Sequence, residues 1–150
     1  MGIDHFGEMH ELASISQPDI CVITNIGLAH MENLGSRDGI LKAKTEVFDH
    51  LRPNASVILN GDDDKLSTVT EVQGKKPVFF GLSDSLDAYA DEIVSQGLRG
   101  TDAVLHLPLG EINVHIPVPG NHMVYNALAG ACVGMKLGLT LDEIRSGITS

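Results

Sequence analysis

The order of apolar runs along the chain is the feature that most narrows the choice of fold. Residues 19–24 and 56–59 are short apolar runs rich in β-branched side chains, and residues 77–81 form a third run. Such runs predict buried strands. Between the first two, residues 36–51 place apolar side chains on one broad helical face and end before Pro53, which indicates a helix. Strand, helix and strand in this order predict a mostly parallel α/β sheet with flanking helices.

A different pattern follows the third strand. Residues 87–96, 101–108 and 111–118 alternate in part between apolar and polar side chains, and glycines separate them. This predicts a small antiparallel β meander with one face open to water. Residues 121–137, which are rich in Ala and Gly, and residues 141–148, which begin with a capping-box pattern, predict two closing helices.

Charge and composition narrow the classes of function. The chain of 150 residues has a net charge of −10, which argues against nucleic acid as a partner because that binding relies on basic surfaces. No apolar run approaches the ~20 residues that span a bilayer, so we expect no membrane insertion. The first residues have neither a basic start nor an apolar core, so we expect no secretory leader. Cys21 and Cys132 lie in apolar runs without a CxxC pattern, which predicts buried, reduced thiols.

The segment TNIGLAH at residues 24–30 contains the first candidate site. In open α/β sheets ligands bind beyond the carboxyl ends of strands, and His30 lies just past such an end. A neutral imidazole there can bind a metal, with Glu32 as a second candidate, although a loop histidine without a role is the simpler interpretation of His30 alone. A divalent cation would also allow an acidic chain to bind phosphate.

An acidic cluster, NGDDD at residues 60–64, follows the second predicted strand. Carboxylates in this position could hold a metal. The residues favour a turn followed by the start of a short helix through Val72, because acidic side chains suit the positive end of a helix. Asn60 and Asp62 are secondary candidates for positions near a nucleotide.

Two further motifs lie on predicted helices. A lysine on a mostly apolar helix is usually a solvated flanking residue, and we expect this of Lys42 in the segment KAKTE at 42–46. The segment GNHMVYNALA at 120–129 places backbone donors at a helix start, which suits an anion or the edge of a base. An asparagine side chain offers both a donor and an acceptor, which suits adenine. The structural alternative is an ordinary Asn N-cap on a helix that packs through small residues.

These motifs, in this order, resemble those of the central, ATP-binding domain of the Mur ligases, and the resemblance spans nearly the whole chain. In that family the histidine matched by His30 contacts a divalent metal, and the lysine matched by Lys44 carries CO₂ as a carbamate. The resemblance therefore implies His30 and Lys44 as catalytic and metal-binding residues. It implies His122, Asn126 and Asn25 as nucleotide-binding residues, with ATP and Mg²⁺ or Mn²⁺ as cofactors. Carbamylation needs a neutral amine, so such a site must lower the pKa of the lysine.

The resemblance is greatest to the members that add D-alanyl-D-alanine to UDP-N-acetylmuramoyl-tripeptide through an acyl phosphate, in bacterial peptidoglycan synthesis in the cytoplasm. These would be the partners of the whole enzyme. The chain contains no Gly-x-x-x-x-Gly-Lys-Ser/Thr phosphate loop. We therefore expect residues 1–150 to be part of the central domain, without the phosphate loop, the UDP-binding N-terminal domain or the C-terminal domain, and to be inactive alone.

Two alternatives remain open at this point. One is a related ligase of the folylpolyglutamate or cyanophycin synthetase type, and the other is a non-catalytic α/β binding module. A partial domain would leave a sheet edge and apolar faces uncovered, which predicts self-association or marginal stability.

Overall fold

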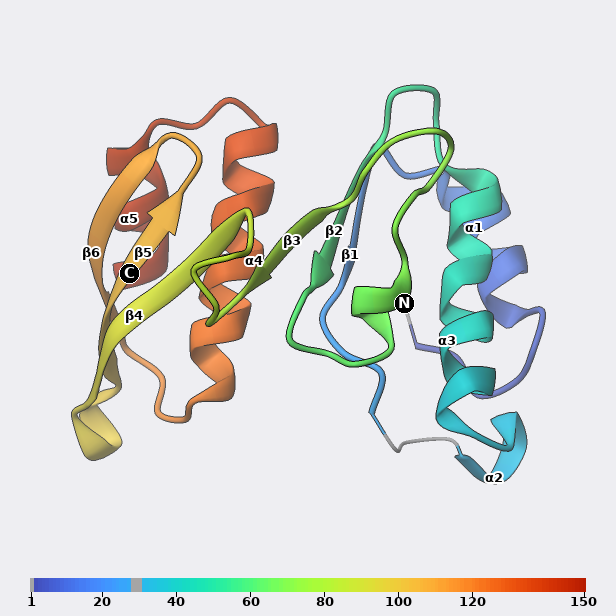
Figure 1. Cartoon of the computed structure of the whole chain (residues 1–150), viewed down its shortest axis with the longest axis horizontal. Coiled ribbons are helices and arrows are strands. Elements are labelled where there is room, and N and C mark those ends of the chain that lie inside the picture. The colour runs from blue at the N-terminus through green and yellow to red at the C-terminus, as the bar shows by residue number, and fades with distance from the viewer. Residues whose placement is uncertain (1, 28–30) are drawn as a thin grey trace.

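The computed structural model describes residues 2–27 and 31–150. Within these residues the chain forms one six-stranded sheet with the strand order β1-β2-β3-β4-β5-β6 (Figure 1). The strands are β1 (Ile20–Ile23), β2 (Ser56–Asn60), β3 (Val78–Gly81), β4 (Ala88–Ser95), β5 (Thr101–Leu107) and β6 (Gly110–Ile116). Each lies within one or two residues of a strand that the sequence predicts.

The sheet is parallel at one end and antiparallel at the other. β1 to β4 pair in parallel, whereas β4, β5 and β6 form an antiparallel meander. The meander continues the main sheet, because residues 82–87 return the chain to the sheet edge beside β3, where Phe80 pairs in parallel with Ala88. The predicted fold class, a mostly parallel sheet with flanking helices and a small antiparallel meander, is confirmed.

The parallel strands are buried on both faces, as their continuous apolar sequences require. Ile23 and Leu59 belong to one apolar cluster, whereas Ile58 and Phe80 belong to another on the opposite face. The first cluster includes residues of α1 (Glu8–Ser16), α3 (Arg37–Thr45) and the 3₁₀ helix η1 (Glu46–His50), and the second includes residues of α4 (His122–Lys136) and α5 (Leu141–Thr149). Figure 1 shows α1 and α3 on one side of β1 and β2, with α4 on the other side.

The meander has one apolar face and one polar face, as its alternating sequence predicts. Its apolar face packs against α4 and α5. On the open face, His106 Nε2 lies 2.9 Å from Asp91 Oδ1, and the Tyr89 ring stacks on His106 with centroids 4.3 Å apart. His115 Nδ1 lies 2.6 Å from Asp102 Oδ1 on the same face.

The helix predicted over residues 36–51 is α3 followed directly by η1. Ser36 caps it, because its Oγ accepts a hydrogen bond from the backbone N–H of Gly39 at 3.1 Å. The short helix α2 (Met31–Leu34) precedes it and was not predicted. At the other end of the chain the predicted capping box is present, with Thr140 N–H donating to Glu143 Oε2 at 2.8 Å.

The helix predicted over residues 62–72 is wrong. The chain forms only a 3₁₀ turn there, η2 (Leu66–Thr68), and Val72 then pairs with Lys75 in an isolated bridge. The backbone is already extended at Val69, with φ −81° and ψ 92°, so the helical turn ends there. The turn between Val72 and Lys75 contains Gln73 with φ 50° and Gly74 with φ 76°.

Helix α1 was not predicted, because the side chain that caps it comes from a distant part of the chain. Its first residue follows Gly7, which provides no side-chain cap. Instead the carboxylate of Glu46 accepts hydrogen bonds from the N–H groups of Gly7, 39 residues earlier, and of His10. A carboxylate at this end of a helix also meets its positive dipole.

The cysteines and the helix lengths bear on two further expectations. Cys21 and Cys132 are buried free thiols, and burial raises the pKa of each to about 11. Along the described part of the chain, no helix has both the length and the apolar character needed to cross a membrane.

Candidate functional site

Several segments meet at one edge of the sheet. Two successive antiparallel pairings make β6 run in the same direction as β4, and so in the direction of β1 to β3. The loops after β1, β2 and β3 therefore open at the same carboxyl edge as the start of α4, which follows β6. This is the edge at which open α/β sheets bind ligands.

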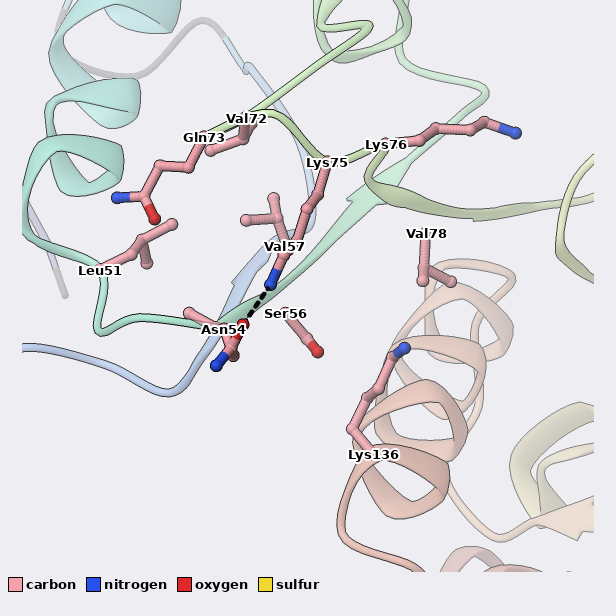
Figure 2. Close-up of a pocket in the computed structure, with 11 residues that line it drawn as sticks. Leu51, Asn54, Ser56, Val57, Val72, Gln73, Lys75, Lys76, Val78 and Lys136 are labelled. Carbon is pink, nitrogen blue, oxygen red and sulfur yellow. Dashed lines mark hydrogen bonds between the residues drawn. The ribbon is translucent and has the colours of Figure 1, made fainter.

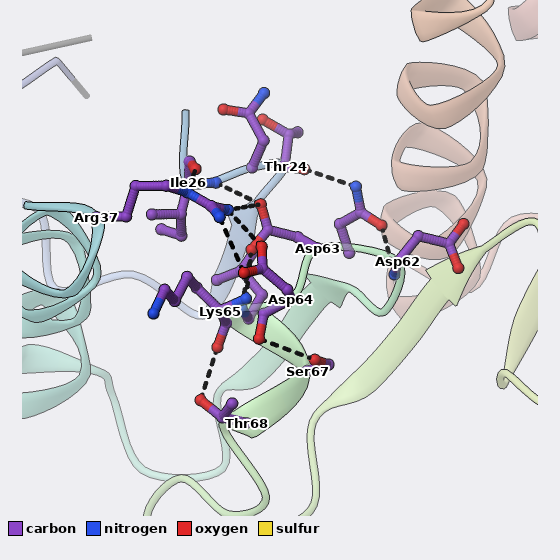
Figure 3. A network of polar contacts seen from close by, with 12 residues as sticks. Thr24, Ile26, Arg37, Asp62, Asp63, Asp64, Lys65, Ser67 and Thr68 are labelled. Carbon is purple, nitrogen blue, oxygen red and sulfur yellow. Dashed lines mark hydrogen bonds and ion pairs between the residues drawn. The ribbon is translucent and has the colours of Figure 1, made fainter. Parts of the chain in front are cut away.

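The loop after β1 is held by side chains from two other segments (Figure 3). The N–H of Ile26 donates to Asp63 Oδ2 at 2.8 Å, and the carbonyl of Ile26 accepts from Arg37 Nε at 2.9 Å. Arg37 in turn donates to both carboxylate oxygens of Asp64. The side chain of Ile26 is buried at 1% exposure. The backbone that leads into residues 28–30 is therefore anchored at this point.

Asn60 joins the ends of β1 and β2. Its Nδ2 donates to the carbonyl of Thr24 at 3.0 Å, and its Oδ1 accepts from the N–H of Asp62 at 3.0 Å. Asn60 is one of the few buried polar residues among those described. Both functional groups of its amide are used, so the role that the structure gives Asn60 is to shape the edge from within.

Lys44 reaches the loop after β1 from α3. Its Nζ donates to the carbonyl of Asn25 at 2.9 Å, whereas the Asn25 side chain is exposed. Burial lowers the pKa of Lys44, and the nearby charge of Asp63 opposes that shift. The direction matters because only the neutral amine reacts with CO₂, so partial burial favours the modification that the sequence resemblance implies. Lys42, two residues earlier, is exposed, as expected.

His30, the histidine predicted to bind the metal, lies outside the described residues, so the structure does not test this prediction. Among the residues that are described, no three or more His, Cys, Asp or Glu side chains are grouped so that they could hold a metal ion. The carboxylates of the acidic cluster make contacts within the protein. Asp63 accepts hydrogen bonds from backbone N–H groups, Asp64 pairs with Arg37, and Asp62 accepts from the N–H of Leu82. The role of the cluster in the structure is to order loops, in line with the turn-and-cap interpretation.

The first turns of α4 present His122 and Asn126 to solvent. Gly120 has φ 117°, a backbone conformation that favours glycine, and a Cβ at this position would lie 2.6 Å from His122 Cε1 and displace that exposed ring. Asn126 Nδ2 lies 3.4 Å from the sulfur of Met123, a weak contact that leaves its amide available. Asn121 makes no side-chain cap, so the ordinary N-cap that was the alternative interpretation does not form.

One side-chain contact ties this helix to the sheet edge, and the sequence did not indicate it. Tyr125 Oη donates to Asp62 Oδ2 at 3.0 Å, across 63 residues of sequence. Tyr125 lies inside the motif at 120–129, but its partner follows only from the topology that places α4 beside the loop after β2. Arg37 was missed for the same reason, because its partners are on other segments.

Two surface hollows border the sheet, and neither contains more than one of the candidate site residues. One is at the opposite, amino edge, where Ser56 and Val78 begin β2 and β3 (Figure 2). There Lys75 Nζ donates to Asn54 Oδ1 at 3.0 Å, and Figure 2 shows Lys136 on the far side. The other hollow follows the outer edge of β1 and includes Thr24 and Lys44. Only the second borders the candidate site.

Comparison with known proteins gives consistent matches over the whole chain. The family model described as the Mur ligase middle domain matches residues 1–134. The chain is 32% identical over 151 aligned residues to the UDP-N-acetylmuramoyl-tripeptide–D-alanyl-D-alanine ligase of Escherichia coli, covering 100% of this chain and 33% of the relative. It is 34% identical to the ligase of the same name from Bacillus subtilis, covering 99% of this chain and 31% of the relative.

Solved structures agree with these sequence matches. A MurF structure from Acinetobacter baumannii superposes with a TM-score of 0.92 at 32% identity, covering 100% of this chain and 33% of that one. The MurF ligase of Thermotoga maritima, solved in complex with ADP, gives a TM-score of 0.83 at 26% identity, covering 98% of this chain and 34% of that one. The chain thus spans about a third of the length of the relatives that it matches.

Proposed function

The chain belongs to the Mur ligase family, and we propose that it is the later part of the ATP-binding middle domain of a ligase that joins D-alanyl-D-alanine to UDP-N-acetylmuramoyl-tripeptide. Matches of 32% and 34% identity over essentially the whole chain, to ligases with this activity in their names, favour this substrate pair over the folylpolyglutamate and cyanophycin alternatives. In this proposal the phosphate loop, the UDP-binding domain and the C-terminal domain lie outside the 150 residues, and the bacterial cytoplasm is the site of action.

The proposed reaction has two steps. The γ-phosphoryl group of ATP moves to a carboxylate oxygen of the tripeptide, giving ADP and an acyl phosphate. The amine of D-alanyl-D-alanine then attacks the acyl carbon and loses a proton, and inorganic phosphate leaves as the amide bond forms. In phosphoryl transfer of this kind, positioning and charge stabilisation supply most of the catalysis.

The residues of this chain have two proposed tasks. His122 and Asn126, exposed at the start of α4, bind the adenine, and Asn25 lies near the nucleotide on the loop after β1. Lys44, as a carbamate, and His30 hold a divalent metal. The observation that best supports this division is the carboxyl edge itself, where the start of α4 and the loop that accepts Lys44 open on the same side of the sheet.

The donor set fits a divalent metal only if Lys44 is modified. An ammonium group cannot bind a cation, whereas a carbamate offers the anionic oxygen ligands that Mg²⁺ prefers. The lowered pKa of Lys44 supports this assignment, because it increases the fraction of reactive amine. When bound, Mg²⁺ or Mn²⁺ would supply positive charge to the phosphoryl oxygens.

The test is a phosphate-release assay on a form of the protein that extends this chain at both ends to the length of its relatives. We expect release of phosphate that requires ATP, UDP-N-acetylmuramoyl-tripeptide and D-alanyl-D-alanine together. Lys44→Gln should lower the rate by about 100-fold or more, because it removes an anionic group from the reaction centre. Lys42→Gln is the matched control on the same helix and should leave the rate unchanged.

Two results would contradict the proposal. Phosphate release that does not depend on D-alanyl-D-alanine would mean that the amine substrate is wrong. Equal rates for Lys44→Gln and Lys42→Gln would mean that Lys44 has no part in the reaction.

A further inference from the structure

Asp62 connects three segments at the carboxyl edge of the sheet. Its Oδ2 accepts hydrogen bonds from the N–H of Leu82, just after β3, at 2.7 Å and from Tyr125 Oη of α4 at 3.0 Å. Its own N–H donates to Asn60 Oδ1 at 3.0 Å, so the carboxylate projects from a backbone that is itself held. In Figure 3 this carboxylate extends from the loop after β2 toward the side on which α4 lies.

The local sequence leaves space for this arrangement. A Cβ at position 81 would lie 2.6 Å from Asp62 Oδ2, so a glycine at the end of β3 allows the carboxylate to lie against the backbone. Burial, together with the hydrogen bond and charge of Asp62, raises the pKa of Tyr125 to about 12. The phenol therefore keeps its proton, and can donate it to Asp62, throughout the neutral range.

The start of α4 is attached to the rest of the chain by a side-chain hydrogen bond and by apolar packing. Pro117, Val118 and Pro119 before it are exposed, and Asn121 provides no cap. Among the described residues, the bond from Tyr125 to Asp62 is the one side-chain hydrogen bond that joins α4 to another segment. The rest of the attachment is apolar packing by residues such as Val124.

Tyr125 is also close to the residues assigned to adenine. On a helix, residues four apart lie on one face, as His122 and Asn126 do, and a residue three positions on lies beside the first. Tyr125 is three positions after His122 and directly precedes Asn126. A displacement of this turn would therefore move both candidate adenine contacts together.

We propose that Asp62 and Tyr125 are positioning residues for the nucleotide: their hydrogen bond holds the first turns of α4 so that His122 and Asn126 meet the adenine. This inference rests on the proposed function, because it takes those two residues as the adenine contacts. Neither Asp62 nor Tyr125 needs to touch the nucleotide. Their effect should be confined to the base and should not extend to the phosphates, which the phosphate loop binds.

The experiment compares two ligands by calorimetry on the extended form of the protein: ATP with Mg²⁺, and inorganic tripolyphosphate with Mg²⁺. Tyr125→Phe removes only the hydroxyl, and we expect it to raise the Kd for ATP about three- to ten-fold, as loss of one hydrogen bond to a carboxylate would. The Kd for tripolyphosphate should not change. Tyr89→Phe, in the only other tyrosine of the chain, is the matched control and should change neither value.

A double-variant cycle distinguishes the effect of losing the hydrogen bond between Asp62 and Tyr125 from a general loss of protein stability. Asp62→Asn keeps an acceptor for the N–H of Leu82 but weakens the bond to Tyr125. The double variant Asp62→Asn/Tyr125→Phe should therefore have a Kd for ATP no higher than the higher Kd of the two single variants. Thermal unfolding of each variant, without ligand, verifies that the compared proteins are folded.

The outcomes distinguish this inference from the proposed function. An unchanged Kd for ATP in Tyr125→Phe, an equal loss of both ligands, or additive effects of the two substitutions would each overturn the positioning role while leaving the ligase proposal intact. If the unsubstituted protein binds ATP no more tightly than tripolyphosphate, the adenine assignment fails, and the positioning role fails with it.

Discussion

Replacing Asn60 by alanine tests how the carboxyl edge is held together. The side chain is 9% exposed and makes two hydrogen bonds of 3.0 Å, one to the carbonyl of Thr24 and one from the N–H of Asp62. A net contribution of about 1 kcal/mol for each bond gives a loss of about 2 kcal/mol in the free energy of unfolding. For a chain of this size that corresponds to a fall in Tm of about 4–8 °C.

The assay is urea unfolding of the protein and its variants, with the free energy taken from the midpoint and slope. Asn113→Ala is the control, since Asn113 is exposed on β6, and its effect should stay within about 0.5 kcal/mol. Asn60→Asp should cost at least as much as Asn60→Ala, because its buried carboxylate can accept from the N–H of Asp62 but would face the carbonyl oxygen of Thr24, to which it cannot donate. If Asn60→Ala costs no more than the control, the two bonds do not hold the edge.

Three further predictions concern the scaffold. Gly39→Ala should destabilise the protein by about 1–3 kcal/mol, because its Cβ would overlap the backbone carbonyl oxygen of Leu34 at the end of α2. Gly130→Ala, in open space on α4, should stabilise it by up to about 1 kcal/mol, and equal effects of the two substitutions in urea unfolding would refute the packing argument. Thr140→Ala should cost about 1 kcal/mol by removing the capping box of α5, and an unchanged unfolding midpoint would argue against that box. The hydrogen bond from His115, and then that from Gln96, lowers the pKa of Asp102, so its ionised form stabilises the fold above the unfolded pKa near 4, and this contribution is lost as pH falls through the lower folded value. Asp102→Asn should therefore be less stable than the unsubstituted protein at pH 7, and this difference should shrink as pH falls below about 4; a pH-independent difference would contradict the assignment.

The strands could be predicted because the pattern of apolar residues in each strand indicates which of its faces are buried. β1 and β2 are continuous apolar runs, and both faces of each are buried. The meander alternates, and one of its faces is open to solvent. In both cases a local pattern reports a local property, namely which faces of the strand are covered.

The errors arose where a distant residue decides the local structure. α1 begins after a glycine and is capped by Glu46, which no reading of residues 7–16 could reveal. Asp63 resembles a helix cap, and its Oδ1 does accept a hydrogen bond from the N–H of Leu66 at the start of η2, but the backbone becomes extended at Val69, so the helix ends after one turn.

In the candidate site, too, local motifs could be predicted from the sequence, whereas contacts between distant residues could not. Sequence motifs that resemble those of the family predicted Lys44, His122 and Asn126 as site residues, and their roles stay predictions. The contacts that position them could not be found from the sequence, since the bonds from Asp63 to Ile26 and from Tyr125 to Asp62 span 37 and 63 residues. His30 lies outside the described residues and stays a prediction.

The decisive measurement is calorimetry with ATP and Mg²⁺, on this chain and on a form extended upstream through the expected phosphate loop. Because the proposed adenine contacts lie in this chain and the proposed phosphate contacts lie in the upstream segment, we expect binding by the extended form and none by the 150 residues alone. Tight binding by the 150 residues alone would contradict this expectation, because the chain would then be a self-sufficient nucleotide-binding module.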